Sequence, residues 1–245
     1  MIERQGIFIS GGGTTMAKVI EACQIKIITG VETGCVIASD PNAGGIQKAI
    51  DLGVPKENIF VINPNDFRNP SAPKTNQVEF GEKIIETLKS RRVSFVTQNG
   101  WMPLTPKNVI DEFSGRIFNQ HPAPVPEFGG KGMYGRRPHQ AIIEFSRLTG
   151  RTDLWTEVIA QRSASSYDAG AVVGSARIYF DLNDTGDTLQ QRALPFEHQL
   201  QIKMVQDFVN GNLIEIHRTE TIVFPGQEDA LQEAKRLAIA KYPNG

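Results

Sequence analysis

The chain has 245 residues, of which 40% are hydrophobic and 22% are charged, and its formal net charge is −1. A chain of this length can bury a substantial core as one α/β domain or as two smaller ones. The balanced charge gives no global reason to expect nucleic acid or an anionic membrane as a partner.

Neither a membrane segment nor a metal site is indicated by the sequence. No uninterrupted apolar run approaches the length that spans a bilayer, and "MIERQGIFIS" holds a strand-like run in place of the longer apolar core of a signal peptide. We therefore expect a cytoplasmic protein. Cys23 and Cys35 stand alone without metal-ligand spacing, so we expect no zinc site and no disulfide framework.

The first 120 residues alternate short apolar runs with segments of helical period. The apolar runs lie at 6–10, 34–39, 59–62, 93–97 and 116–119, and the helical segments at 14–23, 43–53, 78–92 and 106–113. Short apolar strands separated by helices are typical of a parallel sheet that helices cover on both faces. We predict an α/β fold with a Rossmann-like, mostly parallel sheet.

The later residues predict a helix, an antiparallel pair of strands toward the C-terminal part, and two further helices. These lie at 137–148, at 156–162 with 171–180, at 195–211 and at 226–242. Pro195 is expected at the start of its helix, where the missing N–H of proline costs nothing. His139 lies on the first of these helices, where we expect it to be solvated.

The segment "SGGGTTM" follows the first predicted strand and opens the first predicted helix. Glycines here let backbone N–H groups approach an anion, and the helix dipole favours negative charge. Gly11 and Gly13 fit the first two glycines of the dinucleotide fingerprint, but Met16 stands at the third. A tight turn without a ligand is the alternative, but the place at the carboxyl edge of a strand favours phosphate binding. The predicted phosphate-binding residues are Ser10, Gly11, Gly12, Gly13, Thr14 and Thr15.

Asn119 and His121 lie at the end of a short predicted strand. Pro122 restricts His121 to an extended backbone, and side chains two residues apart on a strand point to the same side. An amide and an imidazole on one side can stabilise an oxyanion and exchange a proton. From these residues alone, a structural histidine is the commoner interpretation. Asp168 reads as a turn residue, because nothing in the sequence itself brings it to His121.

Four motifs occur along the chain in the order "SGGGTT", "FNQHPAPVPEFGGKGMYG", "YDAGAVV" and "PFEHQ". Together they resemble the folate-dependent formyltransferases, which carry a Ser-Gly-x-Gly-Ser-Asn loop, an Asn-x-His-Pro site, an Asp-x-Gly turn and a Glu-His near the last helix. The resemblance runs from about Gly6 to Gly211. It implies one domain at 1–211, with a nucleotide-binding half at 1–115 and a folate and catalytic half at 116–211. Residues 212–245 are left as a C-terminal appendage of that domain.

The resemblance also implies an activity. A formyl group would pass from the co-substrate 10-formyltetrahydrofolate to the amine of glycinamide ribonucleotide, a step of purine biosynthesis. The catalytic residues would be Asn119, His121 and Asp168, with Asn119 and a protonated His121 stabilising the oxyanion and Asp168 favouring the charged imidazole.

Binding roles follow from the same likeness. The nucleotide phosphate would bind Ser10 to Thr15, and Glu197 would lie near the ribose or phosphate. The folate would lie against 97–106, and its predicted contacts are Trp101, Met102, Pro103 and Leu104. The expected partners are these small molecules, with no metal, and the assembly is left open between a monomer and a homodimer.

The sequence departs from the family pattern at a few positions. Thr14 stands where the family loop has serine, and Gly12 and Thr15 stand where it often has asparagine. Gln161 replaces a second histidine that many members carry, and an amide cannot titrate. The alternatives are a sibling folate-dependent formyltransferase, a formyltetrahydrofolate hydrolase, or a non-catalytic phosphate-binding module.

Overall fold

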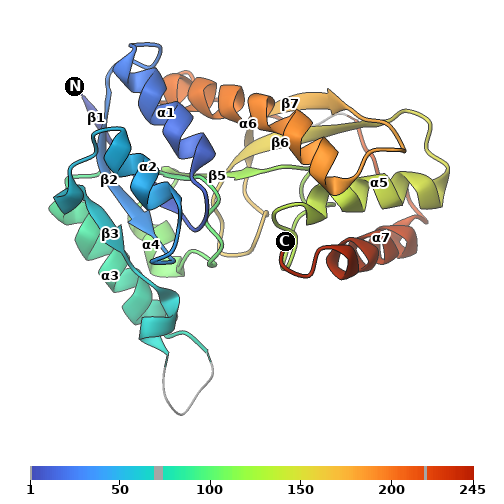
Figure 1. The fold of residues 1–245 in the computed structure, drawn as a ribbon, viewed down its shortest axis with the longest axis horizontal. Helices are drawn as coiled ribbons and strands as arrows, with labels where there is room; N and C mark the ends of the chain where they lie inside the picture. Colours follow the sequence, from blue (N-terminus) through green and yellow to red (C-terminus); the bar gives the residue numbers. More distant parts are fainter. Residues whose placement is uncertain (1, 69–73, 218–219) are drawn as a thin grey trace. The chain divides into compact units, whose positions relative to one another are not determined.

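The fold is built on a seven-stranded sheet with the order β3-β2-β1-β4-β5-β6-β7. The computed structural model describes residues 2–68, 74–217 and 220–245 (Figure 1). The strands are β1 Glu3–Ile9, β2 Val31–Ala38, β3 Ile59–Val61, β4 Phe95–Gln98, β5 Ile117–His121, β6 Trp155–Arg162 and β7 Val172–Tyr179. Strands β1 to β5 pair in parallel and β6 pairs antiparallel with β7. The predicted fold class is therefore confirmed.

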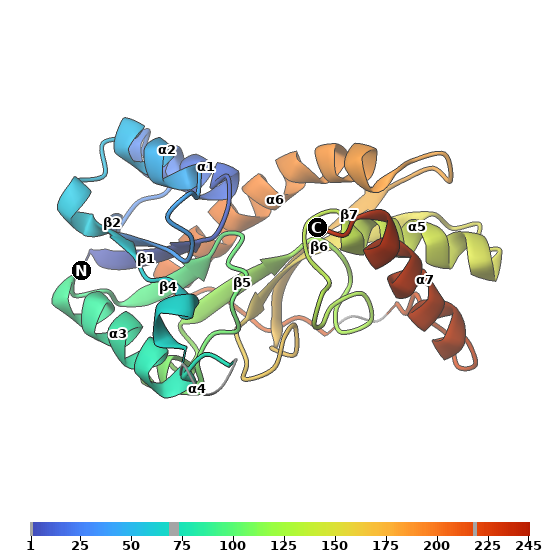
Figure 2. The same cartoon turned by 60° about the horizontal axis from the view of Figure 1, so that its bottom comes forward.

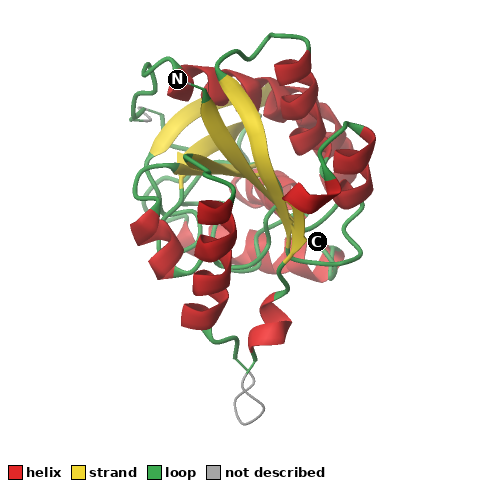
Figure 3. Ribbon diagram, turned by 90° about the vertical axis from the view of Figure 1, so that its left-hand side faces the viewer, coloured by secondary structure: helices red, strands yellow, loops and turns green. Residues whose placement is uncertain are grey.

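The helices alternate with the strands along the first half of the chain and dominate its end. Figure 3 distinguishes helices from strands by colour. They are α1 Thr14–Gln24, α2 Gly45–Asp51, α3 Gln77–Ser90, α4 Lys107–Glu112, α5 Arg137–Thr149, α6 Gly186–Val209 and α7 Glu228–Lys241, with the 3-10 helices η1 Lys56–Asn58 and η2 Pro64–Phe67. Among the described residues, no helix is long and apolar enough to cross a bilayer.

The chain divides into two compact units. The first holds Met1–Asn119, Arg162–Ser165 and Gln201–Leu213, and the second holds Gln120–Gln161, Ser166–Leu200 and Ile214–Gly245. Strand β5 and helix α6 each contribute residues to both units.

The first unit is a parallel sheet that helices cover on both faces. Successive side chains of a strand point to opposite faces, so a strand buried on both faces needs apolar residues at successive positions. Ile7 and Ile9 of β1 pack with residues of α1 and α2 in one apolar cluster. Phe8, between them, packs with residues of α3 and α4 in a second cluster. Figure 2 shows α1 and α2 over one face of β1 and β2 and α3 and α4 over the other. All three side chains are fully buried.

The second unit packs helix against helix beside an antiparallel strand pair. Helix α7 lies along α5, and the two share extensive contacts (Figure 1). Leu231, Ala234 and Ala238 of α7 are buried at the helical spacing of three and four residues. The amphipathic helix predicted near the C-terminus is therefore confirmed.

Helix α6 begins nine residues before the predicted position, at Gly186, and Pro195 lies inside it. The start predicted at Pro195 is therefore wrong. The observed start is fixed by Thr185 and Thr188, because each accepts the backbone N–H of the other on its hydroxyl, at 2.9 and 3.2 Å. This reciprocal pair has the geometry of a capping box.

We predict that Gly13→Ala destabilises the protein more than Gly53→Ala does. Both glycines have left-handed backbones, with φ of 63° and 81°, which cost other residues about 1–2 kcal/mol. A Cβ on Gly13 would also lie 2.8 Å from the Gly45 Cα, whereas one on Gly53 meets nothing within 4 Å. Urea unfolding should give a loss of about 1 kcal/mol for Gly53→Ala and at least about 2 kcal/mol for Gly13→Ala. Equal losses would show that the contact with Gly45 relaxes freely.

Candidate active site

The predicted phosphate loop lies between the carboxyl end of β1 and the N-terminus of α1, in the first unit. Gly13 caps α1, and the helix begins at Thr14. Gly11, Gly12 and Thr14 are exposed, whereas Thr15 is buried. The first N–H groups of a helix have no intrahelical partner and carry the positive end of its dipole. The exposed part of this loop can therefore receive an anion.

Lys48 of α2 adds a cation beside this loop, which sequence reasoning missed. Its Nζ donates a hydrogen bond to the carbonyl oxygen of Gly12 at 2.7 Å. The sequence signal for this approach is Gly45, whose N–H donates to the Gly11 carbonyl at 3.0 Å. A Cβ at Gly45 would lie 3.1 Å from the Gly13 Cα. The absence of a side chain at Gly45 thus lets α2 bring Lys48 to the loop.

The segment predicted to bind folate touches the glycine loop directly. The N–H of Met102 donates to the Ser10 hydroxyl at 2.9 Å, and the N–H of Ser10 donates to the Gly100 carbonyl at 3.0 Å. Trp101 is only 8% exposed and its ring centroid lies 4.8 Å from that of Phe8. The indole is therefore part of the core. Of the four predicted contacts, Met102, Pro103 and Leu104 remain partly or fully accessible.

His121 and Asp168 come together in the second unit, as the resemblance implied, although no local sequence pattern joined them. His121 Nδ1 lies 3.4 Å from Asp168 Oδ1, and both side chains are almost completely buried. His121 Nε2 lies 3.0 Å from the carbonyl oxygen of Phe128. Because a carbonyl can only accept a hydrogen bond, Nε2 carries the proton of the neutral imidazole. Nδ1 is then the nitrogen that can accept a proton, beside the carboxylate.

Asp168 is held by donors from the loop before α5 and from β6. The N–H of Gly130 donates to Oδ2 at 2.9 Å, and Gln161 Nε2 donates to Oδ1 at 2.8 Å. A Cβ on Gly129 would lie 2.6 Å from the Asp168 Cβ, so glycine permits this approach. Asp168 itself has a left-handed backbone, with φ of 52°, which Asp adopts more readily than most residues. The carboxylate therefore has a fixed orientation toward the imidazole.

Burial is the strongest influence on His121 and lowers the pKa of its imidazole below the usual 6.5, while Asp168 and the Phe128 carbonyl act in the opposite direction. The imidazole is therefore neutral at pH 7. Desolvation outweighs the neighbouring carboxylate in this state, and the protonated His121 expected at the oxyanion stage stays a prediction. A buried neutral imidazole with an unprotonated Nδ1 is suited to accept a proton first.

His139 of α5 is fully buried, contrary to the expectation of a solvated residue. Burial and the neighbouring His121 lower the pKa of His139 to about 3. Neither ring nitrogen has a hydrogen-bond partner among the residues that the structure describes. His139 is therefore a neutral neighbour of the His121–Asp168 pair.

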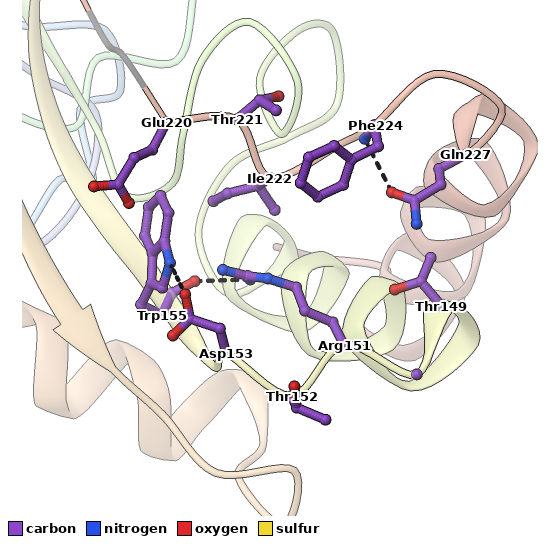
Figure 4. Close-up of a pocket in the computed structure, with 11 residues that line it drawn as sticks. Thr149, Arg151, Thr152, Asp153, Trp155, Glu220, Thr221, Ile222, Phe224 and Gln227 are labelled. Atoms are coloured by element: carbon purple, nitrogen blue, oxygen red, sulfur yellow. Dashed lines mark hydrogen bonds between the residues drawn. The ribbon is translucent and has the colours of Figure 1, made fainter.

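A separate pocket of about 540 Å³ opens in the second unit between the end of α5, the start of β6 and residues 220–227. Arg151 lies in this pocket near Trp155 (Figure 4), with its guanidinium 5.1 Å from the centroid of the indole. None of the predicted site residues lines it. Within the described ranges, no three His, Cys, Asp or Glu side chains form a group that could hold a metal ion.

A sequence model of the family described as "Formyl transferase" matches residues 4–205. The chain belongs to this formyl transferase family. The matched stretch includes the glycine loop, the His121–Asp168 pair and Glu197 and ends within α6, so α7 lies outside it.

Curated relatives of the chain include two formyltransferases of known name. The chloroplastic phosphoribosylglycinamide formyltransferase of Arabidopsis thaliana is 29% identical over 204 residues, which are 83% of this chain and 64% of the relative. The phosphoribosylglycinamide formyltransferase of Haemophilus influenzae is 24% identical over 212 residues, 86% of this chain and 90% of the relative. The chain thus spans less than two thirds of the plant relative.

Solved structures share the fold. The glycinamide ribonucleotide transformylase 1 of Symbiobacterium toebii has a TM-score of 0.72 at 23% identity, covering 89% of this chain and 92% of its own. The phosphoribosylglycinamide formyltransferase of Brucella melitensis has a TM-score of 0.70 at 25% identity, covering 88% of this chain and all of its own.

Two further members of the predicted formyltransferase site have distinct surroundings. Asn119 lies on β5, paired in register with Gln98 of β4, in the first unit. Glu197 lies on α6 in the second unit, where Gln120 Nε2 donates to its backbone carbonyl at 2.7 Å. Glu197 is half-buried, and burial raises the pKa of its carboxyl to about 7. Near neutral pH this carboxyl can therefore either donate or accept a hydrogen bond, as a hydroxyl partner requires.

We predict that Glu197→Gln changes how stability depends on pH. The carboxyl has a pKa of about 7 in the folded protein against 4.5 ordinarily, so between these values the folded state holds a proton that the unfolded state has lost. The contribution of Glu197 to the free energy of unfolding is present below pH 4.5 and is lost as the pH rises toward 7. The neutral amide does not titrate, so the free energy of unfolding of Glu197→Gln should rise relative to wild type as the pH rises from 4.5 to about 7.

Urea unfolding at a series of pH values measures this difference. Glu82→Gln, at an exposed position of α3, is the matched control and should follow the wild type. A constant difference between Glu197→Gln and wild type at all pH values would contradict the raised pKa.

Proposed function

We propose that this protein transfers the formyl group of 10-formyltetrahydrofolate to the amine of glycinamide ribonucleotide. The observation that carries the proposal is the buried His121–Asp168 pair, held by Phe128 and Gly130 inside the stretch that matches the formyl transferase family. Relatives named phosphoribosylglycinamide formyltransferase support the choice of acceptor.

Each unit would offer substrate contacts of its own. The phosphate of the nucleotide would bind the loop from Ser10 to Thr15, with Lys48 as an added cation. Glu197 would bond the ribose or phosphate. The folate would lie against residues 97–106, where Trp101 supports the segment from the core while its neighbours meet the ligand.

Proton transfer would run through His121. As the substrate amine attacks the formyl carbon, Nδ1 would accept the proton that the amine loses, and Asp168 would stabilise the imidazolium. The Asn119 amide would stabilise the oxyanion of the tetrahedral intermediate. When that intermediate collapses, His121 would return the proton to the folate nitrogen that leaves. The tautomer fixed by Phe128 supports this order of events, because it leaves Nδ1 without a proton at the start.

The purified protein, incubated with 10-formyltetrahydrofolate and glycinamide ribonucleotide, should release tetrahydrofolate at a rate that depends on the acceptor. Release without acceptor would assign the protein as a hydrolase, with water in place of the amine. Release that requires another amine would assign a sibling formyltransferase. No release with any acceptor or water would favour a non-catalytic phosphate-binding protein.

We predict that Asn119→Ala lowers kcat by about 100- to 1000-fold, the usual loss when one oxyanion donor is removed. Asn183→Ala, in an exposed turn, is the control and should keep wild-type turnover. Circular dichroism and the unfolding midpoint would show whether both variants fold. Near-normal turnover of a folded Asn119→Ala protein would remove Asn119 from the mechanism.

A further inference from the structure

Helix α7 lies beyond the stretch that the family model matches, yet it belongs to the same compact unit as the His121–Asp168 pair. It packs along α5 (Figure 1), the helix that follows the glycine-rich loop at residues 128–135. The C-terminal segment therefore has access to the loop that supports the pair. The contacts of that segment decide whether it only covers α5 or also acts on the site.

Two cations tie this loop to the C-terminal segment through backbone carbonyl groups. Lys235 Nζ donates to the Gly129 carbonyl at 3.0 Å. Arg137 donates from Nη1 to the Gly132 carbonyl at 2.8 Å and from Nε and Nη2 to the carbonyls of Tyr242 and Pro243 at 2.8 and 2.6 Å. Arg137 thus fastens the end of the chain to the loop, and Lys235 reaches the loop from α7 itself.

The residue that Lys235 holds lies between the two that contact the catalytic pair. The Phe128 carbonyl accepts from His121 Nε2, and the Gly130 N–H donates to Asp168 Oδ2. Gly129, between them, approaches Asp168 so closely that its Cβ would lie 2.6 Å from that of Asp168. A shift of the Gly129 carbonyl would therefore move a partner of each member of the pair.

The positive charge of Lys235 also affects the pKa of the His121 imidazole. Lys235 is half-buried on α7. Burial lowers the pKa of its ammonium below the usual 10.5, while Asp168 and Glu127 act in the opposite direction. The groups that face His121 are Asp168, which raises the pKa of the imidazole, and Lys235, which lowers it together with burial. His139, from α5, is neutral because its pKa is about 3. Lys235 is therefore the cation that offsets the Asp168 carboxylate.

We propose that Lys235 is a positioning residue for the His121–Asp168 pair, because it holds the Gly129 carbonyl and places a fixed positive charge beside the pair. Helix α7 is then part of the apparatus for proton transfer. The inference rests on the proposed formyl transfer for its kinetic consequence, but the protonation of His121 can be measured without any substrate.

The experiment compares Lys235→Met, Lys235→Arg and Arg236→Met. Lys235→Met removes both the donor and the charge, Lys235→Arg keeps both, and Arg236→Met removes a neighbouring charge of α7 that pairs with Glu233. Nitrogen shifts of the labelled histidines, assigned with a His121→Gln variant, report the protonated fraction of His121 at a fixed mildly acidic pH.

We expect that fraction to be higher in Lys235→Met than in wild type, and unchanged in Lys235→Arg and Arg236→Met. An unchanged fraction in a folded Lys235→Met protein would overturn the proposal. If Lys235→Met does not fold, Lys235→Gln gives the same readout, because it also removes the charge.

Kinetics add a second readout if the wild-type protein is active. Lys235→Met should lower kcat by roughly 10- to 100-fold, the scale of a misplaced catalytic group, with the acid limb of its pH profile at higher pH and KM nearly unchanged. Lys235→Arg should restore both. A loss of kcat with an unmoved acid limb would reduce Lys235 to a packing role. An inactive wild-type protein whose His121 protonation still responds to Lys235 would reject the proposed function and keep the inference.

Discussion

The buried carboxylate of Asp168 is the constraint on which the site in the second unit depends. A charge removed from water is stable only where hydrogen-bond donors and opposite charges replace the solvent. Here the N–H of Gly130 and the amide of Gln161 supply the donors, and Lys235 supplies the charge. These groups come from three separate parts of the chain. A loop, a strand and the last helix therefore all contribute groups that stabilise the Asp168 carboxylate.

In the first unit, the constraint is the geometry of the parallel sheet. The carboxyl ends of neighbouring parallel strands meet at one edge, where ligands of such folds bind. Strands β1 and β4 are neighbours, so the loop after β1 meets the segment after β4 through Ser10 and Met102. Lys48 reaches the same loop from α2. The contact between the glycine loop and the segment after β4 is thus a consequence of strand order.

Local patterns predicted the sheet and most helices, because the periods of strands and helices are visible in the spacing of apolar residues within short segments. The start of α6 was missed because Pro195 is a stronger sequence signal than the pair of threonines that caps the helix. The resemblance placed Trp101 among the folate contacts, and only the fold shows that its indole packs on Phe8, far away in the sequence. Lys235 was missed because the carbonyl that it binds is 106 positions away. The helical or strand periodicity of a sequence does not predict a contact between residues so far apart. The family resemblance implied the pairing of His121 with Asp168. The direction of the pKa shift of His121 follows from its burial, which only the fold shows.

The left-handed backbone at Asp168 sets a conflict between folding and chemistry. Glycine would adopt φ of 52° without strain, but it would leave the Gly130 N–H and the Gln161 amide without the acceptor that the carboxylate provides. A screen for thermal stability alone therefore weighs the relief of backbone strain at this turn against the loss of these hydrogen bonds. An engineered thermostable form would have to take its stability from elsewhere, such as the exposed surface of α3 or α6, and leave this turn under strain.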